Sequence, residues 1–186
     1  MEKTTARVIT TLKCTRACPY CVNKQPGILE QGKILLDLKQ LEPYREVLLT
    51  GGEPVLYPQQ LEKLIRSIRE MYPQKEIYLY ASIWSHRSCV YLLNIVDGIH
   101  FTIHNEKDIA KNIEDFQNFQ DDIGMNSLLA LKRSFRLYIL PGIDRPITIR
   151  PYLFSRIECK PYKNPCPIPE NEDLFLLCNH IWSGAQ

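Results

Sequence analysis

The chain has 186 residues, with 23 lysines and arginines against 21 aspartates and glutamates, and a formal net charge of +2. This length lets a single domain bury its own core, and the small charge argues against binding nucleic acid or a membrane surface through bulk charge. No apolar run approaches the roughly 20 residues that a membrane span needs. The first residues also lack the apolar stretch of an export signal, so we expect a cytoplasmic protein.

Short apolar strands alternate with helical stretches along the chain. We expect strands at residues 4–12, 46–50, 76–83, 98–104, 135–140 and 147–154. Helices are expected at residues 37–44, 58–72, 85–95 and 108–133, the last with a break near residues 121–124. Residues 155–186 are rich in proline and are expected to be irregular. Such alternation is typical of βα units around a parallel sheet.

Three of the expected strands carry polar residues on one face only. These residues are Tyr78, Tyr80 and Ser82, then His100, Thr102 and His104, then Thr148, Arg150 and Tyr152. Successive side chains of a strand point to opposite faces, and a sheet covered by helices on both faces would read as nearly continuous apolar runs. We therefore expect an α/β fold, a truncated parallel βα barrel with a polar concave face. Residues 1–154 would form the barrel, and residues 155–186 would form an irregular tail packed on it.

The link between the last two expected strands is too short for a parallel connection. It consists of residues 141–146, whereas a crossover between parallel strands needs about ten residues or more. Either these strands form an antiparallel hairpin or one of the two is not a strand. A shortened barrel would be open on one side, which could admit a large substrate such as a polypeptide.

The cysteines are the most informative residues of the chain. Their number is seven, so they cannot all pair in disulfides, and clustered thiols in a reducing compartment more often hold metal. Cys14, Cys18 and Cys21 supply three thiolates from one loop after the first strand. A [4Fe–4S] cluster normally takes four cysteines, so three would leave one iron open to a reactant. The alternative is a zinc site with a fourth ligand elsewhere.

Two motifs resemble those of the radical S-adenosylmethionine (radical SAM) superfamily. The sequence CTRACPYC at residues 14–21 resembles its three-cysteine signature, with Tyr20 at the aromatic position. The sequence Gly51-Gly52-Glu53-Pro54, after the second strand, resembles its GGEP motif. The two motifs occur in the family's order and each follows an expected strand, which makes the resemblance specific.

The resemblance implies a cofactor set and a radical chemistry. Cys14, Cys18 and Cys21 would bind a [4Fe–4S] cluster, whose open iron would bind the amino and carboxylate groups of S-adenosylmethionine. An electron from a flavodoxin- or ferredoxin-like donor would then cleave S-adenosylmethionine to a 5′-deoxyadenosyl radical, which abstracts hydrogen from a substrate.

The resemblance also assigns contacts to the cofactor. The backbone of residues 51–54 would accept hydrogen bonds from the methionine amino group, and glycines there would let the backbone approach the ligand closely. Tyr20 would lie by the adenine. The polar residues near strand ends would contact the ribose and the carboxylate, although a histidine at a strand end is often only a surface group: Ser82, Thr102, His104 and Arg150.

The other cysteines have open assignments. Cys89 lies among apolar residues and is expected in the core. Cys159, Cys166 and Cys178, with His180 close by, could bind a second cluster or zinc, or could be buried free thiols.

Three functions are compatible with this sequence. The first is an oxidoreductase-type radical SAM enzyme acting on a small molecule or nucleoside. The second is an activating enzyme that generates a radical on a partner protein or modifies a peptide. The third is not an enzyme but an Fe–S electron carrier or zinc-binding scaffold, against which the GGEP motif speaks, since an electron carrier needs no loop for ligand approach.

Overall fold

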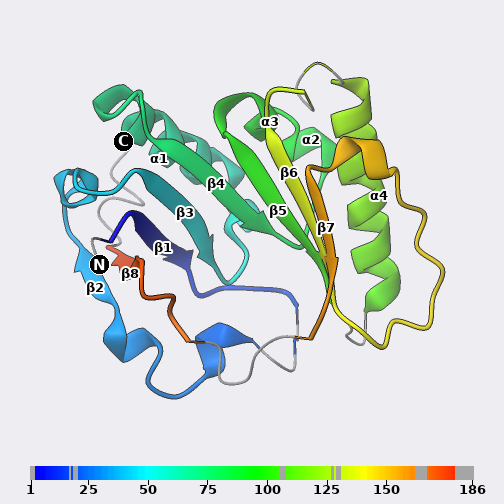
Figure 1. The fold of residues 1–186 in the computed structure, drawn as a ribbon, viewed down its shortest axis with the longest axis horizontal. Helices are drawn as coiled ribbons and strands as arrows, with labels where there is room; N and C mark the ends of the chain where they lie inside the picture. The colour runs from blue at the N-terminus through cyan, green and yellow to red at the C-terminus, as the bar shows by residue number, and fades with distance from the viewer. Residues whose placement is uncertain are drawn as a thin grey trace.

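The fold is built around a single parallel sheet (Figure 1). The computed structural model describes residues 3–16, 18, 21–104, 108–126, 128, 131–161 and 167–178. Within these residues eight strands pair in the order β2-β8-β1-β3-β4-β5-β6-β7, and every pair is parallel. The strands are β1 Thr5–Thr11, β2 Lys33–Leu35, β3 Glu46–Gly51, β4 Glu76–Ala81, β5 Gly98–Ile103, β6 Ser134–Ile139, β7 Arg156–Cys159 and β8 Glu172–Leu177. The sheet is open, which confirms the predicted α/β fold with a partial parallel barrel.

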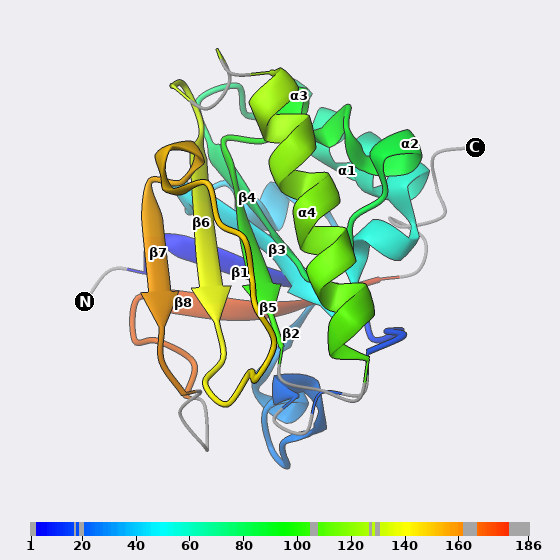
Figure 2. The same ribbon diagram turned by 90° about the vertical axis from the view of Figure 1, so that its right-hand side faces the viewer.

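The α-helices cover one face of this sheet (Figures 1 and 2). They are α1 Pro58–Met71, α2 His86–Cys89, α3 Leu92–Ile95 and α4 Ile109–Met125. Short 3-10 helices occupy the connections: η1 Val22–Lys24, η2 Leu29–Gln31, η3 Leu38–Leu41, η4 Pro54–Leu56 and η5 Pro151–Leu153. In the part of the chain that the structure describes, no helix combines the length and apolarity needed to cross a bilayer.

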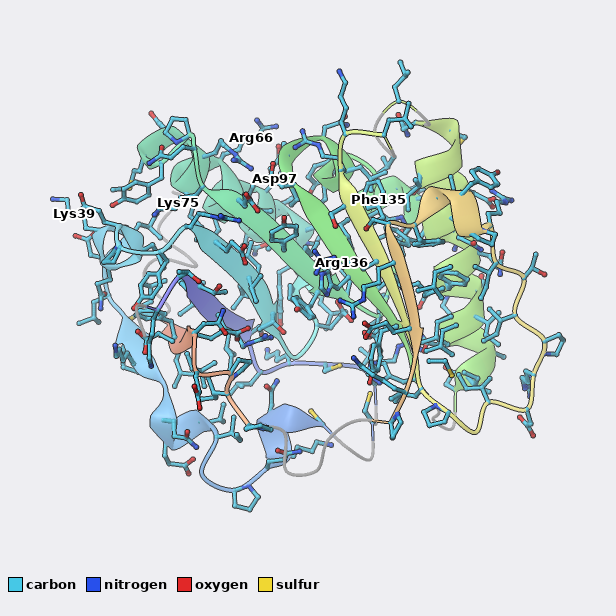
Figure 3. The ribbon with its side chains drawn as sticks, viewed as in Figure 1. Lys39, Arg66, Lys75, Asp97, Phe135 and Arg136 are labelled. Atoms are coloured by element: carbon cyan, nitrogen blue, oxygen red, sulfur yellow. The ribbon has the colours of Figure 1, made fainter. Side chains whose placement is uncertain are left out.

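The two faces of the sheet differ as the alternation predicts. On β4, Ile77 and Leu79 are fully buried against the helices, whereas Tyr78 and Tyr80 on the opposite face are partly exposed. On β6, Phe135 is fully buried while the next residue, Arg136, lies on the open face toward the viewer (Figure 3). One face therefore holds the apolar core, and the other is free to bind ligands.

His100 on β5 lies on this open face, with its ring centroid 4.5 Å from that of Tyr80. Burial lowers the pKa of His100 to about 4, and the charges of Arg136 and Arg7 act in the same direction. Because the unfolded chain takes up this proton near the ordinary pKa of 6.5 and the folded chain does not, stability falls as the pH drops from about 6.5 to about 4.

His100→Gln is expected to flatten this pH dependence. The free energy of unfolding should fall less in the variant, by up to about 1.4 kcal/mol per pH unit within that window. Urea unfolding between pH 7 and pH 4.5 measures both slopes. Identical pH profiles for the two proteins would show that His100 is not buried in its neutral form.

The helices follow their sequence signals with four differences, one of which is that the helix predicted over residues 108–133 ends at Met125. The capping box of Asp37 and Gln40 is formed, but it opens the short η3 rather than a longer helix. Helix α4 runs unbroken to Met125, so the predicted break near residues 121–124 is wrong. Its apolar stripe continues through that region, because Phe119 and Ile123 are both fully buried. The predicted helix at residues 85–95 is split into α2 and α3.

The strand predicted at residues 147–154 is wrong. This segment lies along α4 instead of joining the sheet, since the side chains of Gln117 and Gln120 both donate to the Thr148 carbonyl at 2.9 Å. The Arg150 N–H in turn donates to Gln120 Oε1 at 2.8 Å. Ile147 and Ile149 pack against the core from this position. Apolar and polar residues therefore alternate along the segment as they would in a strand.

The segment predicted to be an irregular tail contributes two strands. β7 extends the sheet beside β6, and β8 lies between β2 and β1, so the prediction of irregular structure is wrong for residues 156–159 and 172–177. The short β2 has no counterpart among the predicted strands. The division of the chain at residue 154 stays a prediction.

Candidate active site and cluster-binding loop

The carboxyl ends of parallel strands meet at one edge of a sheet, and the two sequence motifs lie there. The cysteine loop follows β1, the Gly-Gly pair ends β3, and the ends of β4 and β5 adjoin it. These segments line one cavity of about 310 Å³, within the range of small-molecule sites. The predicted residues that line it are Cys14, Cys18, Cys21, Gly51, Gly52, Glu53, Ser82, Thr102 and His104.

Gly51 and Gly52 hold the cysteine loop by direct backbone contact. The Gly52 N–H donates to the Thr11 carbonyl at 2.6 Å, and the Glu53 N–H donates to the Lys13 carbonyl at 2.9 Å. A Cβ atom would lie 2.3 Å from the Thr11 oxygen at Gly51 and 2.2 Å from the Lys13 oxygen at Gly52. Gly51 also has a φ of +132°, which favours glycine. The two glycines therefore let β3 approach the segment of Thr11 and Lys13 closely, and the predicted approach of a ligand to them stays a prediction.

Glu53 links the second motif to the end of β4. Its Oε2 accepts hydrogen bonds from the N–H of Ser82 at 2.9 Å and from the Ser82 hydroxyl at 2.7 Å. Burial raises the pKa of Glu53 to about 7, although the Ser82 hydrogen bonds and the charge of Arg16 oppose this shift. Glu53 Oε1 is buried and finds no hydrogen-bond partner among the described residues. Such an acceptor on a cavity wall suits a ligand that brings a donor.

Arg16, inside the cysteine motif, anchors the loop to α4. Its guanidinium donates to Asp115 Oδ2 at 2.5 Å and to the Ser82 carbonyl at 2.9 Å. The side chains of Arg16 and Asp115 are only 4% and 3% exposed. Asn112 of the same helix donates to the Ser82 carbonyl at 2.7 Å and accepts from the His104 N–H at 2.6 Å. One helix face thus fixes the cysteine loop and the ends of β4 and β5 relative to one another.

Asp115→Asn is expected to destabilise both the fold and the loop. The substitution leaves the Arg16 charge buried without its carboxylate, which costs about 3 kcal/mol of the free energy of unfolding. Urea unfolding measures this loss. The yield of metal-bound protein shows whether the cysteine loop can still bind metal. Glu114→Gln is the matched control, because its exposed pair with Lys111 contributes about 0.5 kcal/mol or less. Equal effects of the two variants would contradict the anchoring role of Asp115.

His104 and Cys14 have shifted pKa values. Burial, together with the nearby charge of Arg16, lowers the pKa of His104 to about 4. His104 is therefore neutral near pH 7 and can contribute hydrogen bonding rather than charge. Burial raises the pKa of the Cys14 thiol, against a hydrogen bond from the Arg16 N–H at 3.3 Å. A bound metal would supply the positive charge that favours the thiolate.

The three thiols of the cysteine loop share one cavity. Cys14 is exposed and Cys18 and Cys21 are half-buried, and all three line the cavity. Over the described ranges, no three histidine, cysteine, aspartate or glutamate side chains converge on one ion position.

Two predicted residues are not part of this group, and a third cannot be placed. Pro54 is buried at the start of η4 and is not among the cavity-lining residues. Arg150 lies at a different cavity beside α4, with His86 and Tyr152, where it forms an ion pair with Asp121 at 2.7 Å. It is displaced because its segment follows α4 instead of forming a strand. Tyr20 lies outside the described residues.

The C-terminal cysteines are only partly described. Cys159 ends β7 and Cys178 follows β8, and five strands, β1, β3, β4, β5 and β6, separate these two in the sheet order. Cys166 and His180 lie outside the described residues, so a second metal site stays a prediction. Cys89 is buried in the core as expected.

The tail and α4 supply site residues that the sequence did not reveal. Pro167, Ile168 and Pro169, just before β8, line the cavity. Arg16 stands inside the recognised motif, and Asn112 and Asp115 lie near the apolar face of a helix. The polar side chains of Asn112 and Asp115 at helix positions next to the apolar face were the sequence signal that could have identified them as site residues.

A comparison with protein families now adds to the geometry. The model of the family described as 4Fe-4S single cluster domain matches residues 5–118. The chain belongs to this family. The matched residues include both motifs and the anchoring face of α4 and end before β6, so β6, β7 and β8 lie beyond the match. This membership supports a 4Fe–4S cluster as the cofactor of the chain. Comparison with curated proteins finds no match.

Proposed function

We propose that this 4Fe-4S single cluster protein is a radical SAM enzyme. Cys14, Cys18 and Cys21 would hold the cluster and leave one iron open. When bound there, S-adenosylmethionine and the cluster supply a 5′-deoxyadenosyl radical that abstracts hydrogen from a substrate. The observation that carries the proposal is that the two motifs, far apart in the sequence, line the same cavity, and that the second is hydrogen-bonded to Thr11 and Lys13, just before the first.

The other cavity residues have roles in binding and shielding. The carboxylate of Glu53 has a free buried acceptor for a donor group of the cofactor, such as its amino group. Ser82, Thr102 and neutral His104 present hydrogen-bonding groups on the cavity wall. Ile28, Ile168 and Leu174 supply apolar surface that limits access of water to a reactive radical.

The cavity favours a small-molecule substrate over a polypeptide. Residues just before β8 cover one side of the cavity, so the site is less open than a truncated barrel without a tail would be. A protein substrate would require these residues to move. The reducing electron would come from a flavodoxin- or ferredoxin-like donor.

The proposal is tested by S-adenosylmethionine cleavage. Anaerobically reconstituted protein is reduced with dithionite and supplied with S-adenosylmethionine, and 5′-deoxyadenosine and methionine are quantified by chromatography. The proposal predicts that both products form and that both are absent without reductant. Cluster-containing protein that forms neither product would instead support the electron-carrier alternative, and protein that takes up only zinc would support the scaffold.

A further inference from the structure

The open face of the sheet carries a row of side chains outside the cluster cavity. Tyr80, His100, Arg136 and Arg156 are successive cross-strand partners on β4, β5, β6 and β7. They therefore lie on one face at one height along the strands. Tyr80 also lines the cavity, so the row begins at the candidate active site.

Arg136 lies on this face without an ion pair to any described residue. Arg7 is bound by both carboxylate oxygens of Glu172, at 2.6 and 3.1 Å. Arg156 and Lys160 both pair with Glu158. In the described part of the chain no carboxylate lies within ion-pair distance of the Arg136 guanidinium, whose Nε donates to the Ser134 hydroxyl at 3.1 Å.

The placement of Arg136 is unfavourable for the protein alone. Arg156 is its direct cross-strand partner, and like charges in that position destabilise a sheet. Arg136 is also half-buried, which lowers the hydration of its charge. The Ser134 hydroxyl, the Tyr78 ring and the charge of Glu158, whose pKa Arg136 helps to lower, offset part of this cost. A local arrangement whose cost is only partly offset is typical of a functional position.

We propose that Arg136 binds an oxyanion, a carboxylate or phosphate, of the small-molecule substrate. A guanidinium can bind either group through two parallel hydrogen bonds. The rings of Tyr80 and His100 belong to the same row and, being partly exposed, offer stacking surface. Tyr78 lies under Arg136, with 5.8 Å between guanidinium and ring centroid. An anion with a planar neighbour would use both features. This inference rests on the proposed function, since it names the class of substrate.

The distance along the strands suits a substrate that reaches the cluster cavity. Thr102, which lines the cavity, is two residues beyond His100 on the same face of β5. Two residues of a strand span roughly 6–7 Å. If Arg136 held the anionic group of a ligand, the ligand atoms a few bonds from that group would reach the cavity, next to the proposed cofactor.

Ligand-detected NMR on the reconstituted protein tests this assignment. The probes are phenyl phosphate and benzoate, which share a ring and differ in the oxyanion, with neutral benzamide as reference. We expect at least one anion to bind at least tenfold more tightly than benzamide, and the tighter of the two identifies the preferred group. Arg136→Gln should weaken that binding at least tenfold and Arg136→Lys less. Arg66→Gln, an exposed arginine of α1 paired with Glu62, should leave it within twofold.

Two results would overturn the assignment. One is equal binding of the anions and benzamide, and the other is anion binding that Arg136→Gln leaves within twofold of wild type. S-adenosylmethionine cleavage by the wild-type protein is measured on the same preparation. Cleavage without Arg136-dependent anion binding refutes the substrate class alone, whereas anion binding without cleavage refutes the proposed reaction and leaves the anion site standing.

Discussion

Alanine at Cys14, Cys18 or Cys21 is expected to abolish cluster binding and S-adenosylmethionine cleavage. Each thiolate would hold a different iron, so a two-cysteine site cannot retain the cluster. The fold should survive, because the three side chains line a cavity and are not packed in the core. Iron per chain and the visible absorbance of the cluster report binding, and far-ultraviolet circular dichroism reports the fold.

Cys89→Ala is the matched control for these variants. Cys89 is a thiol of α2 that is buried in the core, away from the cavity. This variant should keep its iron and lose only about 1 kcal/mol of stability. If any one of the three loop variants bound as much iron as Cys89→Ala, the assignment of that cysteine would be wrong.

Gly52→Ala is expected to have the second largest effect. Its Cβ would lie 2.2 Å from the Lys13 carbonyl oxygen, so the cysteine loop would have to move away from β3. Such overpacking against backbone costs about 3 kcal/mol. Because the Glu53 hydrogen bond to Lys13 would be lost with it, we also expect a large fall in iron content. Urea unfolding and iron analysis measure the two effects.

Gly124→Ala gives the matched comparison at another glycine. Gly124 lies within α4, and a Cβ there would meet Arg150 Nη1 at 3.4 Å, which is an ordinary contact. Alanine in a helix is favoured over glycine by about 0.5–1 kcal/mol, so this variant should be slightly more stable and keep its iron. Full iron content in Gly52→Ala would contradict the role given to Gly52.

The parallel core of the fold could be predicted from the sequence because its signals are local. Five of the six expected strands and helix α1 lie where apolar periodicity places them. The sixth failed because Ile147 and Ile149 alternate like strand residues while they pack against the core outside the sheet. β8 could not be predicted, since its partners, β1 and β2, lie far away in the sequence.

The candidate site was predictable only where a motif marks it. The motifs give the cysteines and Gly51 to Glu53, and the alternation of β5 gives Thr102 and His104. The Arg16–Asp115 pair depends on how α4 packs across the strand ends, which is a tertiary contact with no local signature. Arg150 was placed wrongly, because its position depended on the mistaken sixth strand.

The central claim is that three cysteines hold a cluster whose open iron binds S-adenosylmethionine. Electron paramagnetic resonance of the reduced, reconstituted protein tests it most directly, with spectra recorded before and after addition of S-adenosylmethionine. The account predicts a [4Fe–4S] signal that changes shape on addition, because the ligand binds the cluster itself. A cluster signal that S-adenosylmethionine leaves unchanged would contradict it.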